Sequence, residues 1–230
     1  MAHNPPPQKI QLFVTCLVDA FYPDVGMAVV DILEAQGITV EFPFAQTCCG
    51  QPAFNGGFWE DARGMARHTL DVLSATTGPI VIPSGSCTSM IIHHYAEILA
   101  DDAVYLPKAQ AVASRTYEFT QFLVDVLGVK NVGASGQGCA TCHPSCHGLR
   151  NLNLRTQSQE LLAEVAGLEM VELPEAESCC GFGGLFAVKM SAISGAMLAR
   201  KLDNVEASGA DVLVGGDVSC LMHMAGGLQR

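Results

Sequence analysis

Short apolar runs alternate along the first half of the chain with longer segments of helical period. The runs are rich in β-branched and aromatic residues, as buried strands are, and lie at residues 11–15, 38–42 and 79–83. The segments between and after them repeat apolar side chains three and four positions apart, which predicts helices at residues 23–36, 59–73, 88–99 and 108–127. Alternation of this kind is typical of a parallel sheet with helices on its faces.

The second half of the chain repeats this order of apolar patterns. Strands are expected at residues 137–143, 168–173 and 211–215. Helices are expected at residues 156–166 and 189–207. The predicted fold class is therefore α/β, with two similar halves that each contain a parallel sheet flanked by helices.

The ten cysteines show that the two halves are a duplication. The pattern of one cysteine, then Cys-Cys-Gly, then one cysteine occurs twice, with 31 and 36 residues in the first set of gaps and 32 and 38 in the second. Residues 40–50 (VEFPFAQTCCG) and 171–181 (VELPEAESCCG) agree at seven of eleven positions. Internal repeats define architecture, so we expect a tail at 1–9 and repeats at 10–130 and 131–230.

The repeated cysteines follow the carboxyl ends of predicted strands. Parallel α/β sheets form their sites at that edge, where the next helix also begins and favours negative charge. Thiolates are the form of cysteine that binds metals, so three loops could bring four sulfurs to one point in each half. The first candidate set is Cys16, Cys48, Cys49 and Cys87. The second candidate set is Cys146, Cys179, Cys180 and Cys220.

Four thiolates suit either tetrahedral zinc or an iron–sulfur cluster. Structural zinc sites usually take ligands from two short knuckles, whereas these ligands include an adjacent pair and spread over about 70 residues. Adjacent residues of an extended chain point in opposite directions, so a pair contacts one small ion awkwardly. The pattern favours iron–sulfur clusters, with zinc and redox thiols as the alternatives.

Charge and hydropathy narrow the classes of partner. With 23 acidic against 12 basic residues the net charge is −11, which argues against nucleic acid as a partner. No run of about 18 apolar residues is present, so no membrane span is expected. The first residues also lack the pattern of a secretion signal. Ten cysteines in such a chain indicate a cytoplasmic metal-binding or redox protein.

The duplicated cysteine pattern resembles the cysteine-rich CCG domain. That domain occurs in heterodisulfide reductase and in the iron–sulfur subunits of glycolate oxidase and anaerobic glycerol-3-phosphate dehydrogenase. Within this family the chain is most similar to the subunits of lactate-oxidising systems. The stretches that carry the similarity span about residues 10–228 and include LFVTCLVDAFYPDVGMAVVDILEAQG, HPSCHGLR, CCGFGGLFAVKMSAISGAMLARK and GGDVSCLMHMAGGL.

The resemblance implies an iron–sulfur electron-transfer subunit of a three-part cytoplasmic system that oxidises L-lactate to pyruvate without NAD. The two partner subunits would be a ferredoxin-like iron–sulfur protein and a small protein. The eight repeated cysteines would hold one or two clusters, of the [4Fe-4S] type. Neither a flavin nor a nicotinamide fingerprint is present, so hydride chemistry by this chain alone is not expected.

The chain departs from heterodisulfide reductase at the last element of each repeat. That relative has Cys-x-x-Cys there, whereas this chain has Met90 and His223 at the position of the fifth cysteine. His223 is therefore a candidate iron ligand, and Met90 a weaker one. The departure makes a thiol–disulfide reductase the alternative rather than the main interpretation, together with a zinc-held scaffold that assembles partner subunits.

Several residues near the second candidate set have two interpretations. Cys139 and Cys142 lie outside the repeat and on opposite faces of a predicted strand, which favours packing over ligation. His143 and His147 flank Cys146 and either tune a cluster or cap the following turn. The glycines of residues 181–184 lack the features of a phosphate loop and are expected to allow close approach of the backbone to cluster sulfur.

Overall fold

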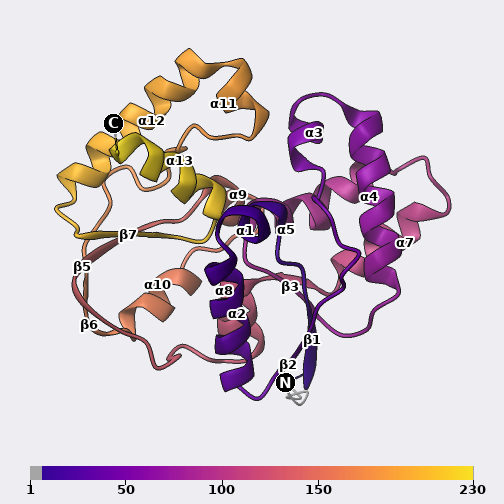
Figure 1. Ribbon diagram of the computed structural model, residues 1–230, viewed down its shortest axis with the longest axis horizontal. Helices are drawn as coiled ribbons and strands as arrows, with labels where there is room; N and C mark the ends of the chain where they lie inside the picture. The colour runs from indigo at the N-terminus through magenta and orange to yellow at the C-terminus, as the bar shows by residue number, and fades with distance from the viewer. Residues whose placement is uncertain (1–6, 230) are drawn as a thin grey trace.

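Two parallel sheets, one in each half of the chain, organise the protein, and a computed structural model describes residues 7–229 (Figure 1). The first sheet has the order β2-β1-β3-β4 and consists of β1 (Lys9–Leu12), β2 (Thr39–Glu41), β3 (Ile80–Ile82) and β4 (Thr116–Glu118). The second has the order β6-β5-β7 and consists of β5 (Ser135–His143), β6 (Ala166–Met170) and β7 (Val212–Gly215). All pairings between these strands are parallel. The α/β fold with two similar halves is confirmed.

Helices connect the strands in both halves, with additional ones in the first half. The first half contains α1 (Cys16–Phe21), α2 (Pro23–Ala35), α3 (Gln51–Asn55), α4 (Trp59–Ser74), α5 (Gly85–Ser89), the π-helical η1 (Met90–His94), α6 (Tyr95–Ile98), α7 (Tyr105–Ala113), α8 (Phe119–Gln121) and the π-helical η2 (Phe122–Val126). The second half contains α9 (Cys146–Arg150), α10 (Gln157–Ala163), α11 (Leu185–Lys189), α12 (Ser191–Ala207) and α13 (Val218–Leu228). The central strands β1 and β5 each pair with two neighbours, so β1, β2 and β3 correspond to β5, β6 and β7.

The first sheet divides the core into two apolar layers. Successive side chains of a strand point to opposite faces, so Ile80 and Ile82 pack with α4, η1 and α6, whereas Val81 packs on the other face with Leu33 of α2 and Phe122 of η2. All five residues are fully buried. Both layers are built mainly from the first half, which gives the cysteine-bearing loops of that half a firm support.

The single helix predicted at residues 108–127 is wrong. The helix α7 ends at Ala113, and β4 follows as the edge strand next to β3. Arg115 donates hydrogen bonds to the carbonyl groups of Leu73 and Gly78, and the side chains of Thr116 and Glu118 are buried. Tertiary pairing with β3 therefore overrides the helical pattern of this segment.

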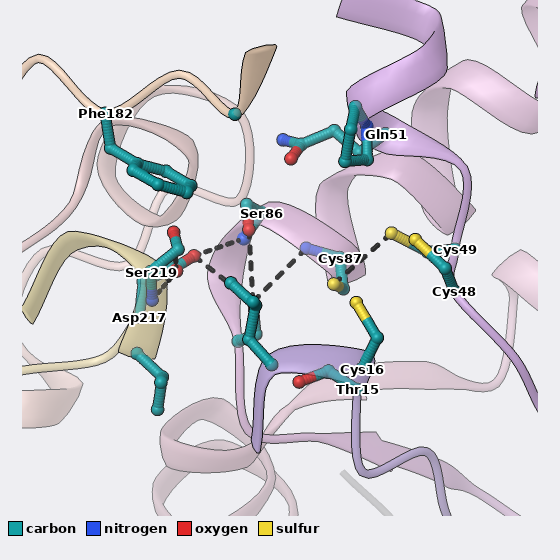
Figure 2. A pocket seen from close by; sticks show the side chains of 15 residues that line it. Thr15, Cys16, Cys48, Cys49, Gln51, Ser86, Cys87, Phe182, Asp217 and Ser219 are labelled. Atoms are coloured by element: carbon teal, nitrogen blue, oxygen red, sulfur yellow. Dashed lines mark hydrogen bonds between the residues drawn. The ribbon is translucent and has the colours of Figure 1, made fainter. Parts of the chain in front are cut away.

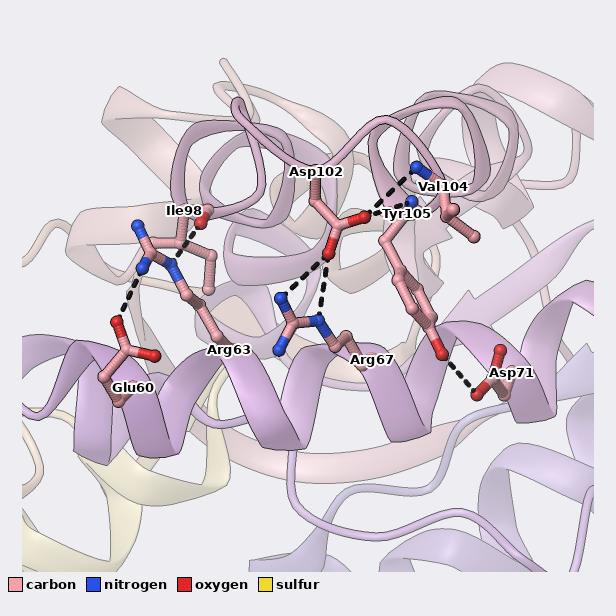
Figure 3. Close-up of polar contacts among 8 residues, drawn as sticks. All are labelled: Glu60, Arg63, Arg67, Asp71, Ile98, Asp102, Val104 and Tyr105. Atoms are coloured by element: carbon pink, nitrogen blue, oxygen red, sulfur yellow. Dashed lines mark hydrogen bonds and ion pairs between the residues drawn. The ribbon is translucent and has the colours of Figure 1, made fainter.

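Helix α4 is fixed to the α6–α7 connection by a polar network on its outer side (Figure 3). Arg67 donates to the Asp102 carboxylate at 2.8 Å, and Asp102 in turn accepts the backbone N–H of Tyr105 at 3.0 Å. The Tyr105 hydroxyl donates to Asp71 at 2.9 Å, and Arg63 donates to the carbonyl of Ile98 at 2.6 Å. These contacts hold α4 in place, and α4 in turn supports the Cys-Cys-Gly loop of the first half.

Residues 1–6 of the predicted tail lie outside the described residues, and Lys9 already belongs to β1. Among residues 7–229, no helix has both the length and the apolar character that crossing a membrane requires.

Candidate metal centres

The four repeated thiols of the first half converge at the carboxyl edge of the first sheet (Figure 2). Cys16 begins α1, Cys48 and Cys49 follow β2, and Cys87 lies in α5. Their thiols contact one another in the order Cys16, Cys48, Cys49, Cys87, and the Sγ atoms of Cys49 and Cys87 are 3.3 Å apart. We call these four residues the first thiol set.

The second half repeats this arrangement. Cys146 begins α9, Cys179 and Cys180 precede α11, and Cys220 lies in the first turn of α13. The thiols again contact one another in chain order, from Cys146 through Cys179 and Cys180 to Cys220. We call these four residues the second thiol set. The structure thus brings together the cysteines that the repeat predicted, four in each half, and their binding of metal remains a prediction.

The backbone before each set has the same unusual conformation. Thr15 and Ser145, which directly precede Cys16 and Cys146, have φ angles of 76° and 56°. Non-glycine residues rarely adopt this left-handed region, and they persist there when the surrounding structure holds them. Strain of this kind concentrates at functional sites, and here it recurs at equivalent positions, directly before the first thiol of each set.

The adjacent cysteine pairs are followed by glycines whose geometry only glycine accepts easily. Gly50 and Gly181 have φ angles of 85° and 89°. A Cβ on Gly181 would lie 2.7 Å from the carbonyl oxygen of Ser194, and one on Gly50 would lie 3.3 Å from the Cβ of Met65. The backbone N–H of Gly181 donates to the Sγ of Cys179 at 3.4 Å. The glycines therefore let the backbone approach sulfur closely.

The pKa of one thiol in each set is lowered by hydrogen bonds from its neighbours. Hydrogen bonds from the Cys16 and Cys49 thiols hold the pKa of Cys48 well below its usual range. In the second set, Cys146 and Cys180 lower the pKa of Cys179 in the same way. Hydrogen bonds to the charged form favour it. Donation to that thiolate, together with burial and like charge, raises the pKa of the thiols that flank it, Cys16 and Cys49 in the first set and Cys146 and Cys180 in the second. A cation bound to all four sulfurs would replace these shared protons.

His143, at the end of β5, is a residue for which the sequence pattern allows two interpretations. Its side chain is 1% exposed, and neither ring nitrogen has a hydrogen-bond partner in the described part of the chain. A ring nitrogen and the Sγ atoms of Cys180 and Cys220 all lie within 4.8 Å of one another. Burial lowers the pKa of His143 to about 4, which keeps the imidazole neutral. Successive side chains of a strand point to opposite faces, so residues 142 and 143 of β5 lie on different faces of the sheet. This alternation was the signal in the sequence that could have distinguished the two interpretations.

The two residues at the position of a fifth cysteine lie in different surroundings. The Nε2 of His223 is 3.4 Å from the hydroxyl of Ser194, which donates to the carbonyl of Gly181, and its ring lies 5.7 Å from that of Phe182. Met90 is fully buried in the apolar layer beneath the first thiol set. His223 thus supports the Cys-Cys-Gly loop in this structure, and its ligation of iron remains a prediction.

The remaining candidate residues, Cys139, Cys142 and His147, belong to neither thiol set. Cys142 is partly buried on the face of β5 opposite to that of His143, and burial raises the pKa of its thiol to about 11. Cys139 is partly buried too, with its sulfur 4.0 Å from a Glu169 carboxylate oxygen. The His147 ring faces the first half, where its Nε2 accepts a hydrogen bond from the Gln51 amide at 3.2 Å.

A cavity of about 120 Å³ adjoins the first thiol set, and a smaller one of about 60 Å³ adjoins the second. The two cavities share lining residues from both halves: Gln51, Ser86, Phe182, Gly184, Asp217 and Ser219. Figure 2 shows Phe182, Asp217 and Ser219 across the first cavity from the thiols, with Ser86 between them. The two thiol sets therefore lie on either side of one boundary between the halves.

The donor sets fit iron–sulfur clusters. Each offers four sulfurs from three loops, which matches the four thiolates that a [4Fe-4S] cluster takes. The second set also has a buried imidazole whose nitrogens lack partners among the described residues, and a buried polar group of this kind calls for an acceptor or an ion.

Comparison with known proteins agrees with this geometry. The family described as "Cysteine-rich domain" (CCG) matches residues 10–92 and 140–225, one copy in each half. Lactate utilization protein A of Macrococcus caseolyticus is 51% identical over 96% of this chain and 90% of its own length. The proteins of that name from Halalkalibacterium halodurans and Shouchella clausii are each 49% identical over 96% of this chain, and over 90% and 92% of their own. The chain belongs to the cysteine-rich CCG domain family, as a duplicated member similar over nearly its whole length to the proteins named Lactate utilization protein A.

Proposed function

We propose that this chain is an iron–sulfur electron-transfer subunit in the NAD-independent oxidation of L-lactate to pyruvate. The observation that carries the proposal is the presence of two equivalent four-thiol sets that face one boundary between the halves. A role in lactate utilisation is supported by the name of relatives at about 50% identity over 96% of the chain.

The chemistry of the proposal follows from the number of centres. Oxidation of lactate to pyruvate releases two electrons and two protons. When bound, an iron–sulfur cluster supplies reversible transfer of one electron. Two thiol sets in one chain therefore match the electron count of the reaction, and cytoplasmic partner subunits, one of them ferredoxin-like, would complete the path to and from this chain.

The residues of the chain hold the sites and tune them. Neighbouring thiols lower the pKa of Cys48 and Cys179, and the backbone N–H groups of Gly50 and Gly181 donate to their sulfurs. Such donors stabilise negative charge on the sulfur. The apolar layer that includes Met90 and Tyr95 excludes water from beneath the first set, while Tyr95 donates its hydroxyl to the carbonyl of Cys49 at 2.8 Å.

A short hydrogen-bonded connection crosses the boundary between the two thiol sets. Ser86, the neighbour of Cys87, donates its backbone N–H to the Asp217 carboxylate at 2.9 Å, and Asp217 precedes Cys220 by three residues. A continuous bonded route therefore connects the last cysteines of the two halves, which supports a subunit that carries electrons between two centres.

Metal analysis of protein purified without oxygen tests the proposal. We expect a brown protein with roughly equal iron and acid-labile sulfide, and lactate-dependent bleaching when the partner subunits are present. Cys49→Ser and Cys180→Ser should each lose about half of the iron, whereas Cys139→Ser, a partly buried cysteine outside both sets, should retain it. A colourless protein that contains zinc and no iron would contradict electron transfer and favour a scaffold.

A further inference from the structure

The second thiol set has polar groups where the first has apolar or neutral ones. Cys146 and Cys16 are equivalent at an offset of 130 residues, so His143 corresponds to Phe13. Gly181 approaches Ser194 and Met197 as Gly50 approaches Ala62 and Met65, an offset of 132. At that same offset, the buried Lys201 of α12 corresponds to Thr69 of α4. The two halves thus differ at two separate positions beside equivalent thiols.

His143 and Phe13 have the same burial but different chemistry. Phe13 is fully buried and packs in the apolar layer that contains Cys49 and Cys87. His143 is 1% exposed beside Cys180 and Cys220, yet both of its ring nitrogens lack hydrogen-bond partners among the described residues. A phenyl ring needs no partner, whereas a buried imidazole without one is costly. The second site therefore contains a donor aimed at the space between its own thiols.

A ring N–H of His143 that donates to sulfur supplies the missing hydrogen bond better than ligation of iron by the ring would. Four thiolates already supply one ligand for each iron of a [4Fe-4S] cluster. A histidine that ligates a metal almost always donates its other ring N–H to a carboxylate, a carbonyl group or water. Neither nitrogen of His143 has such a partner in the described part of the chain, so a ring N–H directed at cluster sulfur fits better.

Lys201 adds a buried positive charge to the same site. Its side chain is fully buried, and its ammonium group donates to the carbonyl of Ala176 at 2.9 Å, to that of Glu175 at 3.2 Å and to the hydroxyl of Ser178 at 3.3 Å. These residues form the loop that leads into Cys179. Charges interact more strongly inside a protein than in water, so this ammonium group favours added negative charge on the second thiol set.

We propose that His143 donates a ring N–H to sulfur of the second cluster and that, with Lys201, it makes this cluster the more easily reduced of the two. Reduction adds one electron and therefore one negative charge, which the N–H donor and the buried cation stabilise. Electrons then move from the first site, which is oxidised, to the second, which is reduced, without a proton being required. This inference rests on the proposed function, because it requires iron–sulfur clusters at both sites.

A redox titration followed by electron paramagnetic resonance tests the proposal on full-length protein purified without oxygen. The wild type should show two waves, of which Cys220→Ser removes the higher and Cys87→Ser the lower. His143→Phe, which copies the first half, should shift the higher wave to lower potential and leave the other in place. His143→Gln retains an N–H donor and should restore part of the shift, and Lys201→Met should move the same wave downward. Phe13→Leu is the matched control and should leave the higher wave unchanged.

A spectroscopic measurement separates donation from a purely structural role of His143. With ¹⁵N-labelled histidine, pulsed resonance should detect a weak nitrogen coupling and an exchangeable proton on the higher-potential cluster, both lost in His143→Phe. A strong coupling typical of direct ligation, equal potentials of the two clusters, or a higher wave that Cys87→Ser removes would each overturn the proposal. Absence of iron and sulfide from the wild type would instead overturn the proposed function itself.

Discussion

Ser84 and Asp217 occupy equivalent positions in the two repeats and hydrogen bond directly to each other. Each lies three residues before the last cysteine of its set, Cys87 or Cys220. The Ser84 hydroxyl donates to the Asp217 carboxylate at 3.2 Å, and their backbones form an isolated antiparallel bridge. Each side chain also caps the helix that contains its cysteine. The halves therefore meet through matching residues, like the two protomers of a symmetric dimer.

We expect Asp217→Ala to destabilise the protein strongly, because one buried carboxylate accepts hydrogen bonds from both halves. It accepts from Ser84, from the backbone of Ser86, and from the backbone and hydroxyl of Ser219. Loss of a helix cap together with unsatisfied buried donors should lower the free energy of unfolding by about 2–4 kcal/mol.

Urea unfolding of the metal-free protein measures this effect. Asp203→Ala is the matched control, since Asp203 is an exposed carboxylate on α12 and its loss should change the free energy of unfolding by less than about 0.5 kcal/mol. Equal midpoints for the two variants would show that Asp217 does not join the halves.

Alanine at Gly181 should disrupt the second thiol set more than alanine at Gly50 disrupts the first. Both glycines have positive φ angles, but a Cβ at Gly181 would lie 2.7 Å from a backbone carbonyl oxygen, against 3.3 Å from a side-chain carbon at Gly50. Backbone strain alone costs about 1 kcal/mol. We expect Gly181→Ala to cost at least twice that amount, since the carbonyl belongs to α12 and yields little.

Chemical unfolding and metal content of the same samples check this order. Gly195→Ala is the control, because Gly195 lies within α12 and a methyl group there would have open space around it. Alanine at that position should stabilise the helix by about 0.5–1 kcal/mol. A Gly181→Ala protein as stable as Gly50→Ala would contradict the close approach.

The convergence of the thiols could be predicted from sequence because it depends on periodicity and topology alone. Short apolar runs located β1, β2 and β3 to within a few residues, and parallel strands end at a common edge. Because Cys16, Cys49 and Cys87 follow those strands in the sequence, the topology brings their thiols together at that edge. The duplication then required the same arrangement in the second half.

The strand β4 and the buried environment of His143 could not be predicted in the same way. Residues 116–118 lie within a helical pattern, and their pairing with β3 is a tertiary contact. The environment of His143 depends on how closely β5 approaches Cys180 and Cys220, which spacing does not reveal. The sequence also pointed to His223, because that residue occupies the position of a cysteine in a relative.

Replacement of Lys201 should weaken the loop that leads into Cys179. Lys201→Met removes hydrogen bonds to two backbone carbonyls and leaves these buried acceptors unsatisfied. The cost of the unsatisfied acceptors exceeds the free energy gained because a charge is no longer buried. We expect a loss of about 1–3 kcal/mol in the free energy of unfolding of the metal-free protein.

The neighbouring Arg200 provides the control for Lys201. Its ion pair with Glu175 is exposed, with 71% of the arginine side chain accessible, and such pairs contribute about 0–1 kcal/mol. The urea concentration at which Arg200→Met unfolds should therefore be close to that of the wild type. If Lys201→Met were as stable as Arg200→Met, the buried ammonium would not be organising this loop.

Glu118 should make the stability of the metal-free protein fall as pH rises from about 4.5 to about 7. Complete burial raises the pKa of its carboxyl from 4.5 to about 7, and the nearby Asp217 acts in the same direction, while Arg155 lines the same cavity. In that window the folded carboxyl keeps a proton that the unfolded chain has lost, so the free energy of unfolding decreases by up to about 3 kcal/mol.

Glu118→Gln should flatten this pH dependence, since the amide has no proton to lose and its oxygen can still accept the backbone N–H groups of Thr120 and Gln121. The measurement is urea unfolding of both proteins at about pH 5 and about pH 8. Other titrating groups, the cysteines included, are common to the two proteins and cancel in the difference. Because the variant lacks the cost of a buried charge, it should be the more stable protein at the higher pH. Identical slopes for the two proteins would show that Glu118 ionises at its ordinary pKa.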